Sequence, residues 1–134
     1  MHDTAPYVAR TGDLTVRVRP SYLAGQSDPT AGRWTWAYHI EIENGGGRPV
    51  QLLSRHWIIT DGRGRVEEVR GAGVVGEQPV IAPGDVYSYA SGCSLATASG
   101  AMSGAYTMTA DDGTFEIAIP AFSLDTPDAR RTMN

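Results

Sequence analysis

A glycine-rich segment is the part of this sequence whose composition most resembles a ligand-binding motif. Residues 71–76 read GAGVVG and match G-x-G-x-x-G, a pattern that lets the backbone of dinucleotide-binding proteins approach a pyrophosphate. That chemistry requires a helix directly after the glycines, but Pro79 and Pro83 argue against one there. It also requires an acidic residue about 20 positions later, and no Asp or Glu lies between Val86 and Ala110. We therefore reject a dinucleotide-binding fold.

Two narrower interpretations of the same glycines remain. Consecutive backbone N–H groups around Gly71, Gly73 and Gly76 can form a concave anion site without a helix, and such a site would bind phosphate or pyrophosphate. Alternatively, the glycines allow a bulge or a wide turn between two strands. We favour the structural interpretation and keep the phosphate-binding loop as the alternative.

Three potential metal ligands alternate along one predicted strand. The side chains of His39, Glu41 and Glu43 share one face, and neighbours on a strand face lie about 7 Å apart. A divalent cation could bridge two of them, but a strand does not bring its ligands together tightly. Three histidines and one cysteine in the whole chain cannot supply a typical structural zinc set. We predict a solvated polar strand face with no metal and keep these residues as weak candidates.

The sequence offers few combinations of residues that could act together in catalysis. Ser54 and His56 fall on the same side of a strand, but nucleophilic catalysis also needs a bond between them and a carboxylate that orients the ring. We interpret Arg55 and His56 as buried, hydrogen-bonded residues that fix the sheet register. Cys93 has no basic neighbour that would lower the pKa of its thiol, so we interpret it as a packing residue. No catalytic residue and no cofactor is predicted.

The elements that must position these residues are strands, because the recurring period is two. On the segment 34–43, alternate residues are apolar, which predicts a strand with one face in the core and the other in water. The same alternation recurs at 14–19, 106–109 and 114–119. Segment 50–60 carries apolar bulk on both faces, with Leu52 and Ile58 opposite Leu53, Trp57 and Ile59, and is predicted to be central or covered on both sides.

Turn residues separate these segments. Residues 44–47 (NGGG), Asp61-Gly62 and Asp112-Gly113 tolerate positive φ, and Pro83-Gly84 suits the centre of a type II turn. The pattern predicts an all-β, immunoglobulin- or fibronectin type III-like sandwich of two antiparallel sheets with seven to eight strands. Residues 1–134 then form one domain, with an ordered core over about 11–124 and loose tails at 1–10 and 125–134.

Composition excludes several classes of protein. With a net charge of −4 and no basic stripe, the chain lacks the electrostatic footprint of a nucleic-acid-binding protein. No stretch of 18 apolar residues exists, so membrane insertion is not expected. The single cysteine forbids an internal disulfide and fits a reducing compartment, which predicts a cytoplasmic location. An unpaired edge strand would permit a homodimer.

Five segments of the sequence are similar to those of a known family. They are 50–61 (VQLLSRHWIITD), 68–79 (EVRGAGVVGEQP), 89–92 (YASG), 100–108 (GAMSGAYTM) and 115–124 (FEIAIPAFSL). In these segments the chain resembles the ApaG family of bacteria, and the similarity extends from about Leu14 to Leu124. It implies a fibronectin type III-like sandwich, an association with cobalt resistance and magnesium efflux, and a proposed pyrophosphate site that falls on Gly71, Gly73 and Gly76. Eukaryotic relatives use the domain as an interaction module, and the resemblance supplies no catalytic residue.

Residues and resemblance together lead us to expect a binding module without enzymatic activity, whose partner is a protein or a small phosphate-containing ligand. Such a module would present an apolar or aromatic groove between the sheets or at a sheet edge. The alternatives are a pyrophosphate or nucleotide sensor that uses loop 71–76, and a direct divalent-metal binder that uses His39, Glu41 and Glu43.

Overall fold

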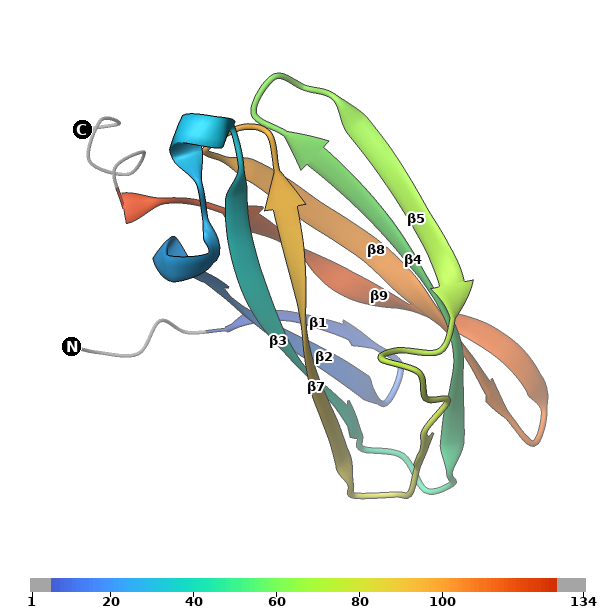
Figure 1. Cartoon of the computed structure of the whole chain (residues 1–134). Coiled ribbons are helices and arrows are strands. Elements are labelled where there is room, and N and C mark those ends of the chain that lie inside the picture. The colour runs from blue at the N-terminus through green and yellow to red at the C-terminus, as the bar shows by residue number, and fades with distance from the viewer. Residues whose placement is uncertain (1–5, 128–134) are drawn as a thin grey trace.

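Two antiparallel sheets stacked face to face make up the computed structural model, which describes residues 6–127 (Figure 1). One sheet has the strand order β1-β2-β3-β7, and the other has the order β5-β4-β8-β9 with β6 added beside β4. The strands are β1 (Tyr7–Thr11), β2 (Leu14–Tyr22), β3 (Trp34–Asn44), β4 (Val50–Asp61), β5 (Val66–Ala72), β6 (Val80–Ile81), β7 (Val86–Leu95), β8 (Gly100–Ala110) and β9 (Gly113–Leu124). Two 3-10 turns, η1 (Ala24–Gln26) and η2 (Pro29–Ala31), link β2 to β3. The predicted all-β sandwich of two antiparallel sheets is confirmed, but residues 6–127 form nine strands where seven to eight were predicted, and one of them, β1, lies mostly within the segment predicted as a tail.

β3 follows its sequence pattern along its whole length. Trp36, Tyr38, Ile40 and Ile42 are buried in the core, while the alternate residues are exposed or half-buried. β2 and β7 flank it in antiparallel register, so β3 is central in its sheet. The apolar alternation alone determined which face of this strand is inside.

β4 is central in the other sheet, between β5 and β8, as its apolar bulk predicted. The predicted faces are wrong, however, because the register with β8 shifts between Leu52 and Ser54. A bulge of this kind inserts one residue and inverts the alternation beyond it. Leu52 and Trp57 are therefore both buried in the core, although they were expected on opposite faces. The same bulge turns Arg55 toward the interior.

The turns mostly agree with the sequence. Gly84 has φ 83°, and the amide of Asp85 donates to the carbonyl of Ala82, which confirms the type II turn at Pro83-Gly84. The predicted N-terminal tail is wrong in part, because residues 7–10 belong to β1 and pair with β2. Their pattern was too weakly apolar to reveal a strand. The rest of both predicted tails, apart from residues 6 and 125–127, lies outside the described residues.

The two long sides of the sandwich differ. On one side β1 and β2 lie against β9, where the Tyr7 hydroxyl and Ser123 Oγ are 3.0 Å apart and the amide of Ala118 donates to Thr11 Oγ1. On the other side the edge strands β5 and β7 stand apart (Figure 1). We call this second side the open side of the sandwich. No helix within residues 6–127 is long and apolar enough to cross a membrane.

Candidate functional site

A cleft of about 550 Å³ lies between the sheets on the open side. The sheet of β4 and β5 contributes one wall, and the sheet of β3 and β7 contributes the other. Aromatic side chains that are buried in the core, Tyr38, Trp57 and Tyr89, reach its floor. Half-buried Val69 and exposed Val75 lie nearer the rim. The volume falls in the range of small-molecule sites, about 300–1,000 Å³.

Arg55 brings a positive charge into this cleft. Its Nη1 donates to the carbonyl oxygens of Gly73 at 2.8 Å and Ala72 at 3.1 Å, at the end of the neighbouring strand β5. A side chain at Gly71, its partner across the ladder, would collide with the guanidinium group. Gly71 therefore allows the arginine to lie against the β5 backbone. No ion pair between the described residues involves Arg55.

Tyrosine hydroxyls face the same region. Those of Tyr89 and Tyr106 lie 2.5 Å apart in the core, and burial raises the pKa of both far above the ordinary value. Burial also raises the pKa of Tyr38, against the opposing effects of a hydrogen bond with Ser91 and the charge of Arg55. All three phenols therefore remain neutral at physiological pH and serve as hydrogen-bonding groups.

Cys93 lines the cleft from β7. Burial, together with the charge of Glu67, raises the pKa of its thiol to about 11. A thiol with such a pKa is protonated near neutral pH and is a weak nucleophile. This finding agrees with the interpretation of Cys93 as a packing residue.

The glycine-rich segment closes one end of the cleft as a tight hairpin. The amides and carbonyls of Val74 and Glu77 bond reciprocally, and positive φ at Val75 (43°) and Gly76 (82°) gives a type I′ turn. The amide of Gly73 donates to the carbonyl of Leu53. The N–H groups of Gly73 and Val74 in the proposed anion loop, and that of Glu77 beside it, thus bond to the backbone itself, and the turn needs glycine at position 76. Binding of pyrophosphate by Gly71, Gly73 and Gly76 stays a prediction.

The sequence model of the ApaG domain matches residues 24–110, which include the whole lining of the cleft. The chain belongs to the ApaG family. Proteins named ApaG from Mesorhizobium japonicum and Brucella canis are 60% and 56% identical over 129 residues, which cover 96% of this chain and 99% of each relative. A crystal structure of a Bordetella pertussis protein described as ApaA matches with a TM-score of 0.83 at 48% identity, covering 93% of this chain and 98% of the other.

The weak metal candidates of this ApaG domain face away from the cleft. Glu41 and Glu43 both pair with Arg17 on the outer face of their sheet, and His39 is exposed beside them. Within residues 6–127, no group of three His, Cys, Asp or Glu side chains is placed to hold a metal ion. Arg17 already pairs with both carboxylates that a cation would use.

Ser54 and His56 do not form a nucleophile–base pair. No hydrogen bond among the described residues joins them, and the His56 ring bonds instead to Glu68 Oε1 at 2.8 Å. That bond, followed by the one from Arg70, lowers the pKa of Glu68. His56 and Arg55 are both hydrogen-bonded, as expected, but they lie on opposite faces of β4 and are only partly buried. Arg55 as a cleft residue was missed, because the bulge that turns it inward leaves no clear signal in the sequence.

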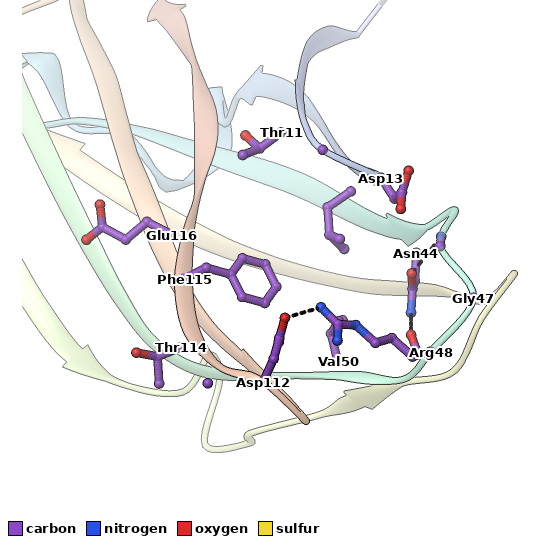
Figure 2. A pocket seen from close by; sticks show the side chains of 14 residues that line it. Thr11, Asp13, Asn44, Gly47, Arg48, Val50, Asp112, Thr114, Phe115 and Glu116 are labelled. Carbon is purple, nitrogen blue, oxygen red and sulfur yellow. Dashed lines mark hydrogen bonds and ion pairs between the residues drawn. The ribbon is translucent and has the colours of Figure 1, made fainter.

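A second cleft, of about 630 Å³, lies at the end of the ApaG sandwich between the β1–β2 and β8–β9 hairpins. Figure 2 shows Phe115 facing into it and Arg48 bridging to Asp112, with an Nη2–Oδ2 distance of 2.9 Å. This ion pair lowers the pKa of Asp112. Unlike Arg55, the arginine of this cleft therefore pairs with a carboxylate of the described residues.

Proposed function

We propose that this ApaG domain is a binding module without catalytic activity, and that its ligand or partner group docks in the cleft between β4–β5 and β3–β7. The observation that carries this proposal is the open side of the sandwich, where aromatic residues and Arg55 face a cleft of about 550 Å³. Concave pockets of this size in which a few polar groups are held in fixed positions are typical of ligand sites, and most of the exposed lining of this cleft is polar. The remaining polar groups at the floor are neutral phenols.

The chemistry of the cleft favours binding over catalysis. Its thiol has a pKa of about 11 and its phenols have raised pKa values. General acid–base catalysis works best with a pKa near the operating pH. A bound compound should therefore be recovered unchanged after prolonged incubation, as mass spectrometry can establish. Turnover of the compound would refute the non-enzymatic proposal.

The association of the family with cobalt and magnesium is proposed to act through such a ligand or partner in the cytoplasm. The carboxylates of Glu41 and Glu43 are occupied by Arg17. Calorimetry with Co²⁺ and Mg²⁺ at millimolar concentration should therefore give no binding heat. A stoichiometric heat that disappears in Glu41→Gln would show direct metal binding instead.

A pyrophosphate-sensing loop is the second candidate, favoured by the position of Val75 and Gly76 in the cleft lining on the same side as Arg55. Gly73→Asp is unsuitable as a test, because a side chain there would overlap the carbonyl of Glu77. Val75→Asp retains a non-glycine residue at the turn and adds a negative charge, while Val75→Asn is its neutral match. If the loop binds pyrophosphate, only the aspartate variant should lose binding.

A thermal-shift screen of small anions, nucleotides, peptides and cations tests the main proposal. A ligand at 100 times its Kd adds about 2.7 kcal/mol of stability, which moves the melting temperature by several degrees. The inward-facing substitution Ser91→Trp should fill the cleft and abolish the shift. Ser88→Trp, on the same strand but facing outward, is the matched control and should retain it. Equal shifts in both variants would place the ligand elsewhere.

A further inference from the structure

The charge of Arg55 lacks a carboxylate partner within the described part of the chain. The five ion pairs between residues 6 and 127 use Arg17, Arg48, His56 and Arg70 as their cations. Arg55 is nevertheless only partly exposed, since it lies between the sheets. A partly buried cation without a counter-ion attracts anions more strongly than a solvated one, because water screens it less.

The geometry leaves part of the guanidinium available. An arginine has five N–H donors, and the only hydrogen bonds that Arg55 makes to described residues run from Nη1 to Gly73 and Ala72. The N–H groups of Nε and Nη2 have no acceptor among the described residues. Among the described residues no buried side-chain nitrogen or oxygen lacks a partner, so these donors reach solvent. Nε and Nη2 form the edge with which an arginine grips a carboxylate or phosphate in two parallel bonds.

The backbone of β5 orients this edge in advance. Gly71 packs against the guanidinium, and the carbonyls of Ala72 and Gly73 hold Nη1. An anion would therefore meet a donor pair that is already positioned, which reduces the entropy lost on binding.

The remaining groups of the cleft select among anions. Arg55 is the only cation in the lining, Glu67 adds a negative charge at the rim, and the thiol of Cys93 is neutral. A single positive charge matches a monoanion better than phosphate or pyrophosphate. Ile59, Val69 and Val75 add apolar surface within the same cleft, beside polar atoms that make up the larger share of its exposed lining.

Resting on the proposed function, we propose that the cleft binds a small monocarboxylate joined to an apolar body, with the carboxylate on the Nε–Nη2 edge of Arg55 and the body between the sheets. The carboxylate can belong to a free organic acid or to the C-terminus of a peptide, because both present the same group.

Calorimetric titration tests this inference with a panel of aryl and alkyl monocarboxylates, such as 3-phenylpropionate, each paired with its neutral amide. The acids should bind at least tenfold more tightly than their amides and more tightly than pyrophosphate. N-acetylphenylalanine compared with a tetrapeptide ending in phenylalanine distinguishes a free acid from a chain terminus. Equal affinity of acids and amides, no binding at 10 mM acid, or tighter binding of pyrophosphate would overturn the inference.

Two variants locate the anion. Arg55→Met should weaken carboxylate binding at least tenfold, whereas Arg70→Met, which removes the same charge from the outer face of β5, should change it less than twofold. Equal effects of the two variants would overturn the inference. The comparison of acid with amide needs no variant and remains decisive if Arg55→Met fails to fold. If another ligand binds the cleft and the carboxylates do not, the inference fails while the proposed function stands.

Discussion

Nη1 of Arg55 lies 2.8 Å from the carbonyl oxygen of Gly73, so the interior arginine of β4 is tied to the glycine-rich turn that closes the cleft. Two features that the sequence analysis treated separately, Arg55 of β4 and the G-x-G-x-x-G segment, are therefore one structural unit. The glycines position the arginine and shape the turn beside it.

Loss of this contact should destabilise the protein. Arg55→Met removes charge-assisted hydrogen bonds to Ala72 and Gly73, and such bonds contribute about 1.5–3 kcal/mol each in favourable cases. Because Arg55 stays partly exposed, we expect a decrease of about 1–2 kcal/mol in the free energy of unfolding. Arg70→Met, whose side chain is 72% exposed, should cost less than about 0.5 kcal/mol. Urea denaturation measures the free energy of unfolding of both variants. Equal decreases would contradict a stabilising role for the contact between Arg55 and the glycine-rich turn.

Gly73 should tolerate no side chain. Its φ is 64°, and a Cβ atom would overlap the carbonyl oxygen of Glu77. Gly73→Ala should therefore cost more than the roughly 1–2 kcal/mol of a left-handed conformation alone. Gly76→Ala is the matched control, because Gly76 has φ 82° but open space around the added methyl group. A cost at Gly73 no greater than the cost at Gly76 would show that the turn rearranges freely.

The Tyr89–Tyr106 pair should behave as a coupled unit. Tyr89→Phe leaves the buried Tyr106 hydroxyl without its partner, and an unsatisfied buried group costs about 1–3 kcal/mol. The double variant removes both hydroxyls and should cost less than the sum of the two single variants. A double-mutant cycle in urea gives the coupling energy. Strict additivity would show that the hydroxyl contact contributes nothing.

Cys93 should resist alkylation until the solution is strongly alkaline. Burial, followed by the charge of Glu67, raises the pKa of its thiol from 9.0 to about 11. As it is the only cysteine in the chain, the rate of iodoacetamide modification reports on it directly. The midpoint of the rate profile should lie near pH 11 in the folded protein and return toward 9 in urea.

The raised pKa of Cys93 also makes the free energy of unfolding depend on pH. Because the pKa of this thiol is higher in the folded protein than in the unfolded chain, its contribution to stability is complete below about pH 9 and is lost as the pH rises toward 11. Cys93→Ser should flatten this part of the stability profile. An alkylation midpoint near 9 in the folded protein would place the thiol in solvent.

The inward face of β3 could be predicted from the sequence, and that of β4 could not. β3 alternates without a break, and its inward residues Trp36 and Ile40 were identified correctly. In β4 the register shift after Leu52 inverts every later position. Nothing in the composition marks this shift, because it depends on how β4 pairs with β8. The inward orientation of Arg55, and with it the central residue of the cleft, follows from that tertiary pairing.

The candidate site was predictable only in outline. An aromatic groove between the sheets was expected, and Tyr38 and Tyr89 lie at the floor of such a cleft. The glycine-rich segment was expected to form a bulge or a wide turn, and it forms a tight type I′ turn with φ 43° at Val75. A valine with positive φ is unfavourable by local preference, so the turn type is imposed by the surrounding hydrogen bonds.

The most direct test of the binding proposal is a titration of ¹⁵N-labelled protein with the strongest ligand from the thermal-shift screen, followed by amide chemical shifts. We expect the perturbed amides to gather at Val75, Ser91 and Cys93, around the cleft between the sheets. Perturbations confined to Gly47, Asp112 and their neighbours would place binding at the end of the sandwich and contradict the binding proposal.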